Sequence, residues 1–137
     1  MFFPPAKRWK QVSAVDPDRE YVAFTSRFYM KSPRRVLRFL ARTGGIEKQV
    51  DEAPGVVGWS LAANLFKMEF YTLSAWEDAE SLQRFAREAE HGAVSREFEL
   101  DMRRPSLFVH YGVKGRDLPL SWKDAVIRQD AVLASSE

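Results

Sequence analysis

Four segments of this chain alternate as β-strands do, yet they carry apolar residues on both faces. In segment 106–113 (SLFVHYGV), Leu107, Val109 and Tyr111 lie on one side of the expected strand and Phe108 lies on the other. An antiparallel strand with one face in water alternates apolar and polar residues instead. The sheet must therefore be covered on both sides, and this requirement restricts the fold more than any other feature.

We expect four strands, with a helix after the first strand and another after the third. The strands cover residues 21–30, 56–65, 68–75 and 106–113, and a short turn joins the middle two into a hairpin. This β-α-β-β-α-β order predicts an α+β, ferredoxin-like fold, in which an antiparallel sheet carries both helices on one face.

Local signals mark the helix ends. Ser32 before Pro33 is typical of an N-cap followed by the first helical residue, and Gly44-Gly45 favours a helix end. Ser74 and Glu77 form an S-x-x-E capping box for the second helix. Further helical stretches are expected at 46–52, at 93–103, and from Ser121 in the tail, where Asp124 follows three residues later.

The chain is long enough, at 137 residues, for one hydrophobic core. Residues 1–20 contain Pro4-Pro5 and Asp16-Pro17-Asp18, which predicts an irregular N-terminal arm. Residues 21–113 form the ferredoxin-like domain, and residues 114–137 form a helical C-terminal tail.

Two helices on one side leave the second face of the sheet without a cover. Each large apolar side chain on that face would contribute about 1.5–3 kcal/mol on burial, and such a patch is typical of an interface. We therefore expect a homodimer through the sheet face. The alternative is that the arm and the tail cover this face within one chain.

Composition excludes several classes of function. The net charge is only +2, with basic and acidic residues interspersed, so we expect no nucleic-acid partner. Cysteine is absent, which excludes disulfides, thiolate metal sites and a cysteine nucleophile. We see no signal peptide and no apolar run of membrane-spanning length, and we expect a cytoplasmic protein with no membrane partner. The aromatic content of 13% is high and favours a lined cavity or an interface.

Two motifs resemble a known family. Residues 54–58 (PGVVG) and 70–78 (FYTLSAWED), followed by His91, resemble an uncharacterised bacterial family of DUF3291 type. That family belongs to the dimeric α+β barrel superfamily, which includes antibiotic-biosynthesis monooxygenases and haem-degrading monooxygenases. The resemblance covers roughly residues 20–113 and implies a dimeric α+β barrel around a small-molecule pocket. It implies no single reaction, because the superfamily hosts oxygenases, isomerases, lyases and proteins with no known activity.

Three residues are candidates for catalysis. In the resembled monooxygenases a Trp at the end of the third strand lines the pocket, so Trp76 either has that role or packs the helix onto the sheet. His91 is either a haem ligand or base, or a helix-terminal residue that interacts with the dipole. His110 is either a base facing a cavity or a core histidine. No group of residues has metal-ligand spacing, so we expect no protein-only metal site.

The remaining candidates line the expected substrate pocket. They are Arg27, Tyr29, Trp59, Asn64, Phe70, Tyr71, Thr72 and Trp76. A register error of one residue would exchange those that face inward for those that face outward. Separately, Arg34, Arg38 and Arg42 form a stripe on the first helix, which either binds a phosphate or an acidic partner or is simply the solvated helix face.

These observations favour a small-molecule-binding protein. The first hypothesis is a monooxygenase-like enzyme that needs no cofactor and acts on an aromatic or polyketide-like substrate. The alternatives are a ligand-binding or interaction module without catalysis, and a haem-binding protein.

Overall fold

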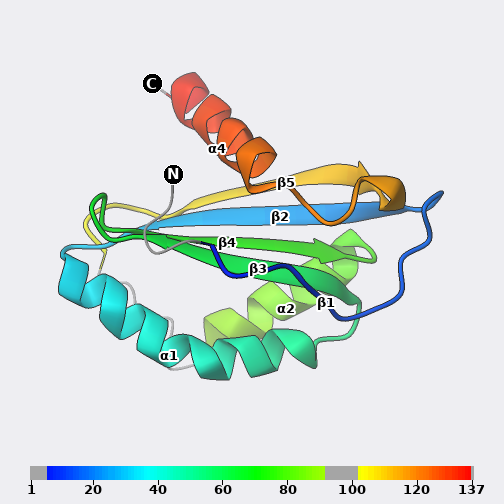
Figure 1. Ribbon diagram of the computed structural model, residues 1–137, viewed down its shortest axis with the longest axis horizontal. Coiled ribbons are helices and arrows are strands. Elements are labelled where there is room, and N and C mark those ends of the chain that lie inside the picture. Colours follow the sequence, from blue (N-terminus) through cyan, green and yellow to red (C-terminus); the bar gives the residue numbers. More distant parts are fainter. Residues whose placement is uncertain (1–5, 92–101, 137) are drawn as a thin grey trace.

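A five-stranded antiparallel sheet forms the middle layer of the protein, with helices on both of its faces (Figure 1). The computed structural model describes residues 6–91 and 102–136, and for residues 42–46, 89–91 and 136 it describes the backbone only. The strands are β1 (Lys10–Gln11), β2 (Glu20–Tyr29), β3 (Val56–Asn64), β4 (Glu69–Trp76) and β5 (Leu107–Lys114). The helices are α1 (Pro33–Asp51), α2 (Ala79–His91) and α4 (Trp122–Ser136), with a 3-10 turn at Gly115–Asp117.

The strand order is β1-β3-β4-β2-β5, with every neighbouring pair antiparallel. From β2 onward this is the predicted β-α-β-β-α-β arrangement, so the α+β ferredoxin-like fold with a C-terminal helix is confirmed. The expected helical stretch at 93–103 falls mostly on residues 92–101, outside the described part of the chain. Among the described residues, no helix has the length and apolar character needed to cross a membrane.

Helix α1 begins as predicted but does not end where predicted. Ser32 is the N-cap, and its hydroxyl accepts the Arg35 backbone N–H at 3.2 Å. The helix then continues through Gly44-Gly45 to Asp51, so the predicted stop is wrong. Each glycine costs about 1 kcal/mol in a helix interior. Packing on the sheet outweighs that cost, because buried apolar side chains, Val36 and Val50 among them, hold both halves of the helix there.

Helix α2 begins later than the predicted capping box. Strand β4 continues to Trp76, so Ser74 is a strand residue, and its hydroxyl accepts the Trp76 indole N–H at 2.8 Å. The cap is supplied by Asp78 instead, whose carboxylate accepts the Ser81 backbone N–H at 2.8 Å and has its pKa lowered by that bond. The capping-box prediction is therefore wrong by one helical turn.

Side chains from α1 and α2 fill the first face of the sheet. Under the first half of α1, the Phe39 ring packs at a tilt against the Phe70 ring, with a centroid distance of 4.6 Å. Under α2, Trp76 is fully buried, and its ring lies 5.1 Å from that of Phe85. Aromatic pairs at these distances contribute beyond their area alone. This face is a packed core.

The second face is covered as well, by the arm and the tail. Trp9 and Trp122 pack against a cluster on this face that includes Tyr21 and Leu73, and Ala125 of α4 is fully buried there. The N-terminal arm is not wholly irregular, because β1 pairs with β3. The expectation that a second copy covers this face is therefore corrected in favour of the alternative, cover by the arm and the tail.

An ion pair between Lys10 and Asp51 also holds the N-terminal arm in place. Lys10 Nζ lies 2.6 Å from a carboxylate oxygen of Asp51 in α1, and the Trp59 indole N–H donates to the other oxygen at 2.7 Å. The hydrogen bond from Lys10, together with that from Trp59, lowers the pKa of Asp51. The arm, α1 and β3 are thus joined through one carboxylate.

A glycine in β3 tests the packing of the arm. A Cβ added at Gly58 would lie 2.4 Å from the Trp9 ring, whereas a Cβ added at Gly112 in β5 would have no atom within 4 Å. We expect Gly58→Ala to lower the free energy of unfolding by about 1–3 kcal/mol, because Trp9 must move. Gly112→Ala is expected to be neutral or slightly stabilising. Urea unfolding of both variants measures this, and equal effects would contradict the packing of Trp9 on β3.

Candidate functional site

Helix α4 crosses the second face of the sheet and is bound to it at several points. At its start, Ser121 caps the helix as predicted, since its hydroxyl accepts the Asp124 backbone N–H at 3.3 Å. The Trp122 indole N–H donates to the Ser60 hydroxyl on β3 at 3.0 Å. Its ring also meets Tyr71 of β4 edge-on, with a centroid distance of 6.4 Å.

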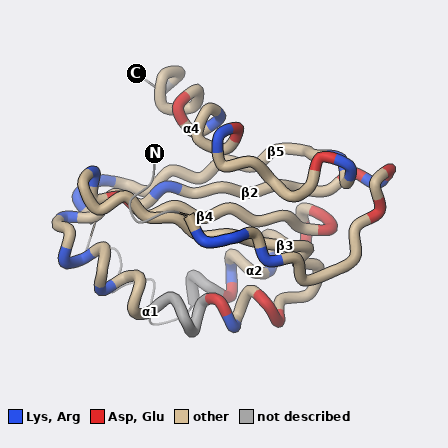
Figure 2. Tube along the Cα trace, in the orientation of Figure 1, with Lys and Arg blue, Asp and Glu red and all other residues tan. Residues whose placement is uncertain are grey.

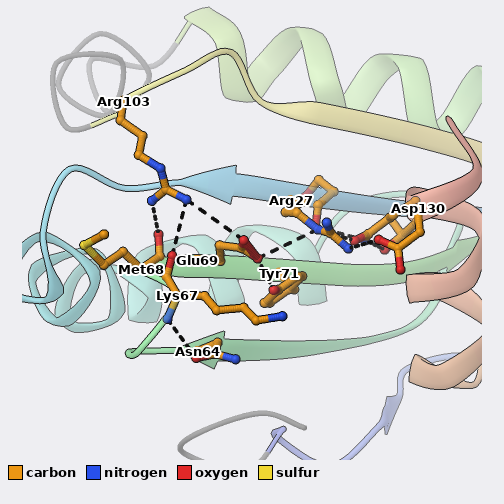
Figure 3. A network of polar contacts seen from close by, with 11 residues as sticks. Arg27, Asn64, Lys67, Met68, Glu69, Tyr71, Arg103 and Asp130 are labelled. Carbon is orange, nitrogen blue, oxygen red and sulfur yellow. Dashed lines mark hydrogen bonds and ion pairs between the residues drawn. The ribbon is translucent and has the colours of Figure 1, made fainter. Parts of the chain in front are cut away.

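A buried polar network fixes the middle of α4 to β2. The side-chain amide of Gln129, which is 0% exposed, donates to the Thr25 hydroxyl at 2.7 Å. Its carbonyl oxygen accepts from Arg27 Nε at 2.9 Å. Arg27 Nη2 lies 3.0 Å from Asp130, and Figure 3 shows these two side chains meeting between sheet and helix. Burial alone lowers the pKa of Arg27, but the bond to Asp130 and the neighbouring groups raise it overall.

The network continues along β4 to the hairpin turn (Figure 3). The Tyr71 hydroxyl donates to the Glu69 carboxylate, which also lies 4.0 Å from both Arg27 and Arg103. Burial, followed by the Glu69 carboxylate, raises the pKa of Tyr71, so the phenol keeps its proton. Arg103 in turn donates to the backbone oxygen of Met68 at 3.2 Å. These groups are already paired with one another, so this network holds the structure together.

Beside the network, a groove of about 640 Å³ lies between β5 and α4. This volume is within the range of small-molecule sites. Its apolar lining includes Tyr111, Val113 and Leu120. Its charged lining consists of Glu20, Lys114, Asp117, Asp124 and Arg128. The groove is therefore apolar in part, with charges of both signs in its walls.

Tyr111 is the groove residue with a polar atom left unsatisfied. The Arg128 guanidinium lies 4.0 Å from the centre of the Tyr111 ring, and Arg128 Nε donates to Asp124 at 3.0 Å. The Tyr111 hydroxyl is buried and has no hydrogen-bond partner among the described residues. Burial, and then the charge of Asp124, raises the pKa of Tyr111. This hydroxyl is therefore a protonated donor without an acceptor among the described residues.

The structure does not bring the predicted pocket residues together on one side of the sheet. Arg27, Tyr29, Asn64 and Tyr71 lie on the α4 side, while Trp59, Phe70, Thr72 and Trp76 lie on the side of α1 and α2. The predicted pocket included both even-numbered and odd-numbered positions of the same strands. Because successive side chains of a strand point to opposite faces of the sheet, these residues lie on two different faces. None of the four residues on the α4 side lines the groove, and Tyr29 and Asn64 lie at the other end of the sheet, opposite Glu69.

The three catalytic candidates also lie apart. Trp76 is buried in the core, and its indole N–H is bound to Ser74. His110 is exposed on β5, opposite Phe24 of β2. His91 is the last residue of α2, and its side chain lies outside the described part of the chain. In the described ranges, no group of three or more acidic or histidine side chains is arranged to hold a metal ion.

Sequence reasoning missed Tyr111, Arg128 and Gln129. Tyr111 had a signal, because it alternates with Val109 and Val113 on a strand whose two faces were both apolar. Arg128 and Gln129 had none, since the position of a tail helix relative to the sheet is a tertiary property.

Comparison with known proteins defines the fold. No protein-family model matches the sequence, so the resemblance to the DUF3291-type family stays a prediction. No curated protein matches it either. Solved structures do match, among them antibiotic-biosynthesis monooxygenases and other proteins of ferredoxin-like fold. At these identities the matches show a shared fold.

Three of these structures illustrate the range of proteins that share this fold. A monooxygenase from the gene ActVA-Orf6 of Streptomyces coelicolor, in complex with the ligand Nanaomycin D, has a TM-score of 0.56 at 20% identity, covering 77% of this chain and 96% of that one. A dimeric ferredoxin-like protein from an uncultured marine organism has a TM-score of 0.57 at 11% identity, covering 72% and 91%. LmHde, a heme-degrading enzyme from Listeria monocytogenes, has a TM-score of 0.52 at 15% identity, covering 76% and 66%.

Two neighbouring residues of α4 test how the helix is held. Gln129→Met keeps the side-chain length but leaves Arg27 Nε and the Thr25 hydroxyl buried without this partner. We expect it to lower the free energy of unfolding by about 2–3 kcal/mol. Asp130 is 62% exposed, so Asp130→Asn is expected to cost less than about 1 kcal/mol. Urea unfolding of both variants tests this. A Gln129→Met protein as stable as the wild type would show that α4 is not anchored here.

Proposed function

We propose that this protein binds a small, uncharged, hydroxylated aromatic molecule in the groove between β5 and α4. The observation that carries the proposal is the Tyr111 hydroxyl, a buried donor at the groove with no hydrogen-bond partner among the described residues. Leaving such a group unsatisfied costs about 1–3 kcal/mol. A ligand oxygen that accepts a hydrogen bond from this hydroxyl removes that cost, and the bond also orients the ligand.

The charges of the groove support an uncharged ligand. Its walls carry the carboxylates of Glu20, Asp117 and Asp124 and the cations of Lys114 and Arg128. Arg128 is already bound to Asp124. An anion would therefore meet an excess of carboxylates, whereas a phenolic hydroxyl can donate to one of them. The Tyr111 and Leu120 side chains supply apolar contact for the ring.

A second candidate function is cofactor-independent oxygenation of the bound molecule. Tyr111 favours it, because a phenol that keeps its proton stabilises an oxyanion as charge develops. In such a reaction a methylene carbon loses both hydrogens and gains a carbonyl oxygen from O₂, and the other oxygen atom leaves with those hydrogens as water. The substrate supplies all four electrons, so no cofactor takes part. Oxygen uptake equal to the ligand consumed would support this function. Uptake at the background rate would exclude oxygenation and leave ligand binding as the proposed function.

Haem binding, the other alternative, does not fit the residues near Trp76. Among the described residues, packed side chains fill that region, with Trp76 fully buried and Trp59 only 3% exposed, and this packing argues against a porphyrin there. No step of the proposed function passes through haem.

We further propose that the protein forms a homodimer, as predicted from the sequence, although through another surface. The marine ferredoxin-like protein, described as dimeric, supports dimer formation. Because α4 and the arm cover the second face, the interface would use side chains that stay exposed beside β5. Phe108 is such a side chain, exposed by 58%, and it packs beside Phe24 on the face opposite α4. Sedimentation equilibrium should show a dimer that Phe108→Ser weakens; a monomer at every concentration would refute the proposal.

Two tyrosines give a matched test of the ligand site. Tyr29 and Tyr111 both have a buried hydroxyl without a hydrogen-bond partner among the described residues, but only Tyr111 lines the groove. We expect Tyr111→Phe to weaken binding of 1-naphthol or a dihydroxynaphthalene about 3- to 10-fold, as loss of one hydrogen bond does. Tyr29→Phe should leave binding unchanged. Isothermal titration calorimetry measures both variants.

The anionic analogue 1-naphthoate serves as a control for charge and should bind more weakly than 1-naphthol. The proposal fails if the wild-type protein binds none of these molecules. It also fails if Tyr29→Phe weakens binding and Tyr111→Phe does not.

A further inference from the structure

One end of the protein is strongly basic (Figure 2). Three segments meet there: the start of α1 with the residues before it, the β3–β4 turn, and residues 102–104. The Met30 backbone N–H donates to the Met68 carbonyl at 2.8 Å, and the Arg103 backbone N–H donates to the Tyr29 carbonyl at 2.9 Å. Segments far apart in the sequence therefore form one continuous surface, which we call the basic end (residues 31–38, 65–68 and 102–104).

The basic end carries seven cations and no carboxylate of its own. The cations are Lys31, Arg34, Arg35, Arg38, Lys67, Arg103 and Arg104. The adjoining Glu69 is only 8% exposed and is already bound to Tyr71. The first turn of α1 contains no acidic residue to balance its helix dipole. Cations at a helix N-terminus are unfavourable, so an anionic partner at this surface would relieve an existing repulsion.

Large apolar side chains project from the same surface. Phe66, at the tip of the β3–β4 turn, is 82% exposed, and Leu37 of α1 is 54% exposed. The turn that carries Phe66 is ordered by hydrogen bonds, because the Lys67 N–H donates to the Asn64 side chain at 3.0 Å and the Met68 N–H to the Leu65 carbonyl at 3.3 Å. The turn that carries the exposed Phe66 therefore has a defined conformation.

We propose that the basic end docks on an anionic lipid bilayer. Clusters of Lys and Arg bind the negative surface of such a bilayer. An aromatic side chain buried at the boundary between headgroups and acyl chains adds a second, independent contribution. Phe66 enters that boundary, and Arg34, Lys67 and Arg104 pair with headgroup phosphates around it.

This arrangement fits a membrane surface better than a nucleic acid. Proteins that bind single strands stack successive bases on several aromatic rings along a groove. Here Phe66 is a single exposed ring in the β3–β4 turn, while the Tyr29 ring lies buried beneath Arg103 and Arg104. The sequence predicted no membrane partner because it has no apolar run of membrane-spanning length, but docking on a bilayer surface needs no such run. The net charge of +2 averages over the chain, and the fold gathers cations at one end.

Docking at this end leaves the proposed ligand groove open. Strand β2 runs from Glu20 to Tyr29. Glu20 lines the groove, whereas Tyr29 lies under the arginines of the basic end. A protein bound to a bilayer in this way can therefore still take up a ligand.

Co-sedimentation of the full chain with lipid vesicles tests the proposal. We expect binding to phosphatidylcholine vesicles that contain phosphatidylglycerol and none to pure phosphatidylcholine, with affinity falling as salt rises. Each of Arg34→Gln, Lys67→Gln and Arg104→Gln should weaken binding about fivefold. Phe66→Ser should weaken it as well, without changing the salt dependence.

Matched variants elsewhere on the surface serve as controls. Arg116→Gln removes an exposed cation at the far end of β5, and Ile127→Ser removes an exposed apolar side chain from α4. Both should bind vesicles as the wild type does. Equal loss in these controls, or no loss in the charge variants and Phe66→Ser, would overturn the proposal. So would binding of a single-stranded oligonucleotide that needs the same residues while anionic vesicles do not bind.

Discussion

The buried guanidinium of Arg27 is the feature on which the α4 side of the protein depends. The Arg27 side chain is only 9% exposed, so its charge needs hydrogen-bond or ion-pair partners, and β2 alone does not supply them. They come from β4 through Glu69 and from α4 through Gln129 and Asp130. Buried ion pairs often contribute more to specificity than to net stability. Here the pairing sets where α4 lies along the sheet, because a shift of one residue would break both bonds.

Much else follows from the position of α4. With Gln129 over β2, the preceding Arg128 lies over Tyr111 of β5, and Trp122 reaches Ser60 of β3. The helix thereby covers the second face and forms one wall of the groove. The groove and the cover of the second face thus both depend on how α4 docks.

The strand pattern predicted the fold well, because alternation and turn signals are local. Apolar residues on both faces correctly indicated that both faces of the sheet are covered. The pattern could not say whether a second chain or the C-terminal tail covers the second face. The errors occurred where tertiary packing overrides a local signal. Gly44-Gly45 stays helical, and the Ser74–Glu77 pair lies at a strand end, with Asp78 as the cap instead.

The candidate site was less predictable than the fold. Arg27 and Tyr71 were selected from the sequence, and they lie in the polar network beneath α4, yet the predicted pocket mixed the two faces of the sheet. Tyr111 could have been found from its strand, whereas Gln129 gains its role only through contacts more than a hundred residues away. The basic end was hidden for the same reason, because its cations lie in three separate segments of sequence.

The central claim is that α4 docks on the sheet of its own chain through Gln129. Nuclear Overhauser effects from the Gln129 side-chain amide measure this directly, in a sample that mixes isotope-labelled and unlabelled chains. We predict contacts to the Thr25 methyl group within one chain. Their absence would contradict the account, and so would contacts seen only between a labelled and an unlabelled chain, because α4 would then cover a partner's sheet.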